Sequence, residues 1–134
     1  MEEFTNFSEE ALYSAQQIAA IAAFELKDGF SSCLILGEGE KADALFLKMK
    51  FQGIQADRAP KPGSRYEMIF LFRSAEPGFL SEYTSQGALV LDAAEEKSHA
   101  CHFDPKPSYR QIRLLSLADG KRYPAYPFLP DSKT

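Results

Sequence analysis

The chain of 134 residues has no tryptophan, only two cysteines and two histidines, and no apolar run of the roughly 18 residues that a membrane-spanning helix needs. Two cysteines do not supply the disulfide framework of a small secreted domain. The first residues, Met1-Glu2-Glu3-Phe4, are acidic where a secretory signal is basic and then strongly apolar. We therefore expect a cytoplasmic protein with free thiols and no membrane segment.

What the chain does contain is ordinary for a globular domain: 45% of its residues are hydrophobic and 25% are charged. No internal repeat or low-complexity tract is visible. A chain of this length can bury a sizeable core without disulfide or metal support. We predict one domain over residues 1–134, with poor order expected only at 1–7 and 131–134.

The first part of the chain alternates between helical and strand patterns. Ser8 is a suitable N-cap for a helix to about Lys27, and Gly29 follows the helix end. The apolar run at 33–36 is typical of a parallel strand that is buried on both faces. A second helix over about 40–52 then leads to a short strand at 54–57, which completes a predicted βαβ unit.

The first helix carries two apolar stripes. One contains Leu12 and the alanines that follow it at helical spacing, and the second contains Tyr13, Ala20 and Phe24. A helix that is apolar on two sides is expected to be covered on more than one side.

Further strands are predicted at 66–72 and 88–91, with a short helix over 77–83 between them. After Asp92 the segments alternate or carry prolines, which predicts antiparallel strands at 99–103, 109–117 and 121–123 and an extended strap over 123–130. The predicted fold class is α/β: a small Rossmann-like three-layer domain with a mainly parallel central sheet and an antiparallel C-terminal hairpin.

The turn after the first strand is the best candidate for a ligand site. Ligands of open α/β sheets bind outside the carboxyl ends of the strands, where Gly37 and Gly39 would allow close approach of a backbone. Asp57 follows Gly37 by twenty residues, which is the spacing of an acid that holds ribose hydroxyls. With Glu38 between the glycines, these residues form a candidate nucleoside pocket.

The same loop departs from a dinucleotide or P-loop motif. Ala42 stands where a third glycine would be, and Glu38 and Glu40 would repel a phosphate. These departures disfavour phosphate binding at the helix terminus, and we reject a dinucleotide-binding or P-loop interpretation. The alternative without a ligand is that Glu40 complements the helix dipole and that the glycines make a tight turn.

Polar residues also follow the next two strands. Arg73 and Ser74 come after the strand at 66–72, and Asp92 ends the strand at 88–91. If the strands are parallel, these residues and the Gly37 loop converge on one edge of the sheet. Charged residues in solvated loops also need no function, so we assign no catalytic residue.

The stretch from Leu34 to Asp57, with the strands at 66–70 and 88–91, resembles the nucleoside half of S-adenosylmethionine-dependent methyltransferases. It also resembles the first half of sugar isomerase domains, and Phe72-Arg73-Ser74 would then stand in the sugar-phosphate-binding turn. Lys41 stands near a position where the methyltransferase pattern has glycine, and Glu40 stands where the isomerase pattern has a hydroxyl residue. The resemblance therefore implies shared architecture more than shared activity.

A cluster of possible metal ligands lies at His99, Cys101 and His102. In a strand the first two would point to one face and the third to the other, and no second pair completes a tetrahedral site. Nucleophilic chemistry at Cys101 with a neighbouring histidine is a further possibility, beside an ordinary edge segment. We expect no metal and no other cofactor.

The charge of the chain is unevenly distributed. Residues 1–104 carry nine lysines and arginines against seventeen acids, whereas 105–134 carry six against two. The basic residues alternate with aromatics, which suits a protein interface, although the tail could equally pack on its own acidic body. The acidic body argues against nucleic acid as a partner. The candidate partner-binding residues are Arg110, Arg113, Lys121, Arg122, Tyr123 and Tyr126.

Two functions remain open. In the first, the chain is a non-catalytic interaction or assembly module that docks a protein partner or a second copy through its basic, aromatic C-terminal region. In the second, it is a small-molecule-binding domain or enzyme with a nucleoside or sugar-phosphate pocket at the Gly37–Gly39 loop. We prefer the first because no combination of acid, base and nucleophile is visible.

Overall fold

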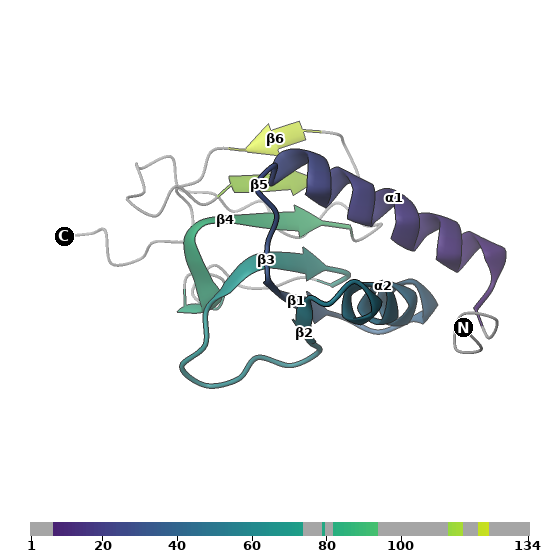
Figure 1. Ribbon diagram of the computed structural model, residues 1–134, viewed down its shortest axis with the longest axis horizontal. Helices are drawn as coiled ribbons and strands as arrows, with labels where there is room; N and C mark the ends of the chain where they lie inside the picture. Colours follow the sequence, from purple (N-terminus) through teal and green to yellow (C-terminus); the bar gives the residue numbers. More distant parts are fainter. Residues whose placement is uncertain (1–6, 74–78, 80–81, 94–112, 117–120, 124–134) are drawn as a thin grey trace.

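The computed structural model describes residues 7–73, 79, 82–93, 113–116 and 121–123 (Figure 1). The predicted strand at 99–103, the predicted strap beyond Tyr123 and the termini at 1–6 and 131–134 lie outside these residues.

Helix α1 (Glu9–Glu25) begins where the capping pattern predicts. The Ser8 hydroxyl accepts a hydrogen bond from the backbone N–H of Ala11 at 3.1 Å, which satisfies one of the free donors at the helix start. The helix ends two residues earlier than predicted, with Leu26 as its C-cap. Gly29 closes the following turn by donating its N–H to the Leu26 carbonyl at 2.8 Å.

One side of α1 is packed and the opposite side is not. Its buried residues are Ala11, Ala15, Ile18, Ala19 and Ala22. The prediction that other parts of the chain cover the second stripe is wrong, because Tyr13 is 64% exposed and Phe24 is 66% exposed. The packed stripe consists mainly of alanines, and the aromatic residues of the second stripe face solvent.

The predicted βαβ unit is confirmed. Strand β1 (Ser32–Leu36) is followed by helix α2 (Glu40–Phe51) and strand β2 (Gln55–Asp57), and β1 pairs with β2 in parallel. On its other side β1 pairs in parallel with β3 (Tyr66–Leu71). Strand β1 is therefore an inner strand of the sheet, as its continuous apolar run predicts.

Strand β4 (Thr84–Asp92) is longer than predicted. It begins four residues before the predicted apolar run and includes Gly87. The register with β3 shifts between Tyr66 and Met68, so the start of β4 carries an irregularity that accommodates the extra residues. Residues 79 and 82–83 before it are helical, as expected.

The C-terminal strands differ in part from the prediction. Strand β5 (Arg113–Ser116) pairs in parallel with β4, although the sequence suggested an antiparallel arrangement. Among the described strands, β6 (Lys121–Tyr123) is the antiparallel one, and it pairs with β5 from Leu114↔Tyr123 to Ser116↔Lys121. An alternating pattern is typical of antiparallel sheets, but in this segment it did not predict the parallel direction in which β5 pairs with β4.

The six strands form one sheet in the order β2-β1-β3-β4-β5-β6 (Figure 1). Helices α1 and α2 pack together against one face, on which Cys33, Met68 and Leu89 lie. Residues of the other face, including Leu34, Ile69 and Val90, are also fully buried. The described part is thus a mixed α/β structure with a mostly parallel sheet and with α1 and α2 on one side of it.

In the described residues, neither α1 nor α2 combines the length and hydropathy required to cross a membrane.

Candidate functional site

The carboxyl ends of the parallel strands lie in one row, as predicted. Leu36 of β1 is in register with Leu71 of β3, which is in register with Asp92 of β4, and Asp92 with Ser116 of β5. The loops that leave these strands therefore start from a common edge. This edge is where open α/β sheets usually bind ligands.

The Gly37 loop is pressed against the end of β3. A Cβ atom at Gly37 would lie 2.7 Å from the Cβ of Phe72, and Gly37 has a φ of +114°. The Phe72 N–H also donates to the Leu36 carbonyl at 2.8 Å, so the pairing of β1 with β3 continues one residue beyond the end of β3. Glycine is required here for close packing within the chain, and the space beside it is filled by Phe72.

Arg58 holds the same loop from the other side, and the sequence analysis missed it. Its guanidinium donates to the carbonyl oxygens of Ile35, at 3.2 Å, and of Gly37, and it pairs with the Asp43 carboxylate on α2. The guanidinium carbon lies 5.8 Å from the centre of the Phe46 ring. One side chain thus joins β1, the loop and α2. The only sequence signal was an arginine directly after the predicted second strand.

Asp57 ends β2, as predicted, but its carboxylate is used inside the chain. The Tyr66 hydroxyl donates to Asp57 Oδ2 at 2.6 Å, and the ammonium of Lys61 lies 3.7 Å from Oδ1. The Tyr66 hydroxyl also accepts from the Lys61 N–H at 3.2 Å. Burial and the Asp57 carboxylate together raise the pKa of Tyr66 above its ordinary value. These contacts tie the 58–65 loop to the sheet.

Glu40 contacts the start of the other helix. Its carboxylate accepts from the Ser8 N–H at 2.6 Å and from the Ser8 hydroxyl at 3.1 Å. Lys41 and Glu10 form a second, looser link between the two helix starts, with 3.8 Å between nitrogen and oxygen. Glu40 therefore stabilises the helix termini, whereas Glu38 and Gly39 are exposed.

The remaining predicted ligand residues are spread over the same edge. Arg73 is exposed just after β3, and Asp92 is fully buried at the end of β4. Ser74 lies outside the described residues. A buried carboxylate needs compensating contacts, so Asp92 is the residue of this set whose charge depends most on its surroundings.

Cys33 is buried in β1, and its thiol is not activated. Burial, with the nearby Asp57 charge, raises its pKa to about 12. Within the described ranges, no group of three or more histidine, cysteine or acidic side chains is arranged to hold a metal ion. The predicted candidates His99, Cys101 and His102 lie outside those ranges.

The predicted partner-binding residues that are described lie on the last two strands. Arg113 begins β5, and Lys121, Arg122 and Tyr123 make up β6. Because β6 ends the order of the described strands, it is an edge strand of the sheet that they form. Arg110 and Tyr126 lie outside the described residues.

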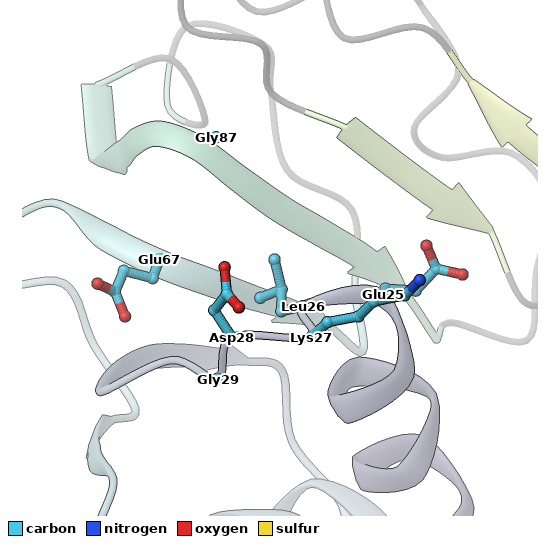
Figure 2. A pocket seen from close by; sticks show the side chains of 7 residues that line it. All are labelled: Glu25, Leu26, Lys27, Asp28, Gly29, Glu67 and Gly87. Carbon is cyan, nitrogen blue, oxygen red and sulfur yellow. The ribbon is translucent and has the colours of Figure 1, made fainter.

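A hollow of about 410 Å³ opens at the opposite, amino edge of the sheet (Figure 2). It is lined by the turn after α1, by Glu67 and by Gly87. Figure 2 shows the carboxylates of Glu25, Asp28 and Glu67 spread along the hollow rather than directed at one point. Glu67 accepts from the Ser31 N–H at 2.6 Å, so its role there is to hold the chain before β1.

Comparison with protein-family models, with curated proteins and with solved structures finds no match to this chain.

Proposed function

We propose that the chain is a non-catalytic, cytoplasmic interaction or assembly module, built on a Rossmann-like three-layer scaffold, that docks a protein partner through its basic, aromatic C-terminal region. The observation that carries the proposal is the internal use of the predicted pocket. Gly37 packs on Phe72, and the Asp57 carboxylate accepts a hydrogen bond from the Tyr66 hydroxyl. Both carboxylate oxygens of Glu40 accept hydrogen bonds from Ser8. These contacts favour a structural edge over a nucleoside pocket.

The position of β6 supports the choice of docking surface. An edge strand offers backbone donors and acceptors to another chain, and lysine and arginine on such a strand discourage pairing with arbitrary partners. Lys121 and Arg122 add positive charge to a chain whose first 104 residues together carry a net negative charge. A partner with an acidic surface or an acidic extended segment fits this arrangement.

The test is copurification of tagged full-length protein with cellular partners, in wild type and in Lys121→Glu/Arg122→Glu. Reversal of two charges on the edge strand should abolish partner recovery while the melting temperature stays close to wild type. Asp57→Asn serves as the control, because it changes the other predicted site and keeps an oxygen that can accept from Tyr66. Equal recovery of partners by all three proteins would contradict the proposal.

The second candidate is a nucleoside or sugar-phosphate pocket at the carboxyl edge, with Gly37, Glu38, Gly39, Asp57, Arg73, Ser74 and Asp92 as its residues. It is favoured by one observation, the complete burial of the Asp92 carboxylate in the row of strand ends. A thermal-shift screen against S-adenosylmethionine, S-adenosylhomocysteine, nucleotides and sugar phosphates separates the two. A ligand at 100 times its dissociation constant should stabilise the protein by about 2.7 kcal/mol, and a saturable shift lost in Asp57→Asn would favour the pocket.

A further inference from the structure

The exposed side of α1 carries no charge over most of its length. From Tyr13 to Phe24 the exposed residues of the helix are two aromatics, two glutamines and two alanines: Tyr13, Gln16, Gln17, Ala20, Ala23 and Phe24. The solvent face of a surface helix is normally charged or strongly polar. Depletion of charge with enrichment of aromatics is instead typical of the core of a protein interface.

The spacing on this face is that of a helix-pairing seam. Tyr13, Gln17, Ala20 and Phe24 recur at intervals of four, three and four residues, which is the alternation of the core positions of a coiled coil. Gln17 donates to the Tyr13 hydroxyl at 2.8 Å along the same seam. The two large rings stand at its ends, and small or unbranched side chains lie between them.

The seam is self-complementary in the antiparallel direction. If two copies of α1 pair about a two-fold axis between residues 18 and 19, Tyr13 faces Phe24 of the second copy and Gln17 faces Ala20. The same alignment brings Glu10, in the acidic first turn, to the end of the other helix, where Lys27 follows the C-cap Leu26. Antiparallel helices also place opposite ends of their dipoles side by side.

We propose that α1 forms a homodimer contact, in which the Tyr13–Phe24 seam of one chain packs antiparallel on the same seam of a second copy. A symmetric contact of this kind uses one surface patch twice, which is the commonest way in which soluble proteins form dimers. The seam is roughly 16 Å long at 1.5 Å per residue and is smaller than a standard interface of about 800 Å² per partner. The dimer is accordingly weak and depends on concentration.

The first experiment is sedimentation velocity of the full-length chain from about 10 µM to about 1 mM, a range that covers dimers of micromolar to millimolar affinity. Wild type should shift reversibly from monomer to dimer across this range. Phe24→Gln should remain monomeric, because each dimer loses two aromatic contacts. Phe51→Gln is the matched control: Phe51 is also 66% exposed but lies at the end of α2, off the seam, so it should dimerise like wild type.

A charge exchange tests the antiparallel alignment. Glu10→Lys and Lys27→Glu should each weaken dimerisation by about tenfold, because each changes two symmetric pairs worth up to about 1 kcal/mol apiece. The double exchange should restore it. Within one chain the two residues lie at opposite ends of α1, whose 17 residues span roughly 25 Å, so direct contact inside a monomer cannot explain a rescue.

A wild-type chain that stays monomeric up to about 1 mM would overturn the proposal, as would a dimer that tolerates Phe24→Gln, or one that the double exchange fails to restore. Lys121→Glu/Arg122→Glu should leave this dimer intact. Failure of partner docking at β6 and failure of the α1 contact are therefore separate outcomes.

Discussion

Gly37 and Phe72 are in such close contact that a single added methyl group at Gly37 would lie 2.7 Å from the Phe72 Cβ. The contact joins the loop after β1 to the end of β3, at the edge where a ligand would be expected. The edge is closed at this point by the chain itself.

Gly37→Ala should therefore destabilise the protein by about 3 kcal/mol, from backbone strain at a φ of +114° together with overlap with Phe72. Gly39→Ala is the matched control, because Gly39 has a similar φ of +122° but no atom within 4 Å of an added Cβ. It should show only the strain, about 1–2 kcal/mol. Urea unfolding measures both, and equal losses would contradict the close contact.

Arg58→Met should cost about 2–3 kcal/mol in the same assay, because the carbonyls of Ile35 in β1 and of Gly37 in the following loop lose this donor. Asp43→Asn should cost less than about 1 kcal/mol, since the pair with Arg58 is half exposed and screened by water. If Asp43→Asn proved as costly as Arg58→Met, the ion pair rather than the carbonyl contacts would be the source of stability.

Sequence reasoning found the elements whose local pattern is strong. We predicted the buried strand β1, the N-cap at Ser8 and the βαβ order, because burial and capping depend on the pattern of residues that are close in the sequence. The position of Asp57 at the end of β2 followed from the same pattern.

Other features depend on contacts between distant residues and could not be predicted in this way. The early start of β4 depends on the pairing of Thr84 with Tyr66, a contact between residues that are distant in the sequence. The stripe with Tyr13 and Phe24 has the pattern of a buried face, but only a tertiary neighbour could bury it. Arg58 acquires its role because the chain after β2 returns beside the Gly37 loop.

Cys33 should resist thiol reagents until the protein unfolds. With a pKa of about 12, its thiolate fraction at pH 8 is about 10⁻⁴, against about 0.1 for the ordinary value of 9, and its side chain is also fully buried. Cys101→Ser leaves Cys33 as the single thiol, and labelling with iodoacetamide can be followed by mass spectrometry. Fast labelling of the folded variant at pH 8, at the rate seen in denaturant, would contradict this environment.

Tyr66→Phe should cost about 1–3 kcal/mol at neutral pH, because Asp57 loses the donor that lies 2.6 Å from its carboxylate. The folded-state pKa of Tyr66 is raised above its unfolded value of about 10, so its contribution is complete below pH 10 and is lost as the pH rises through the folded-state pKa. The stability gap between wild type and Tyr66→Phe should therefore be constant from about pH 7 to 9 and narrow above about pH 10.

Asp57→Asn is the companion variant for this titration. It removes the carboxylate charge that helps to raise the Tyr66 pKa but leaves the burial that is the larger cause. The alkaline loss of stability should then begin at a lower pH than in wild type. Tyrosinate absorbance, taken as the difference between each protein and its Tyr66→Phe counterpart, follows the same group directly. A Tyr66 titration that Asp57→Asn leaves unmoved would show that the carboxylate does not act on this hydroxyl.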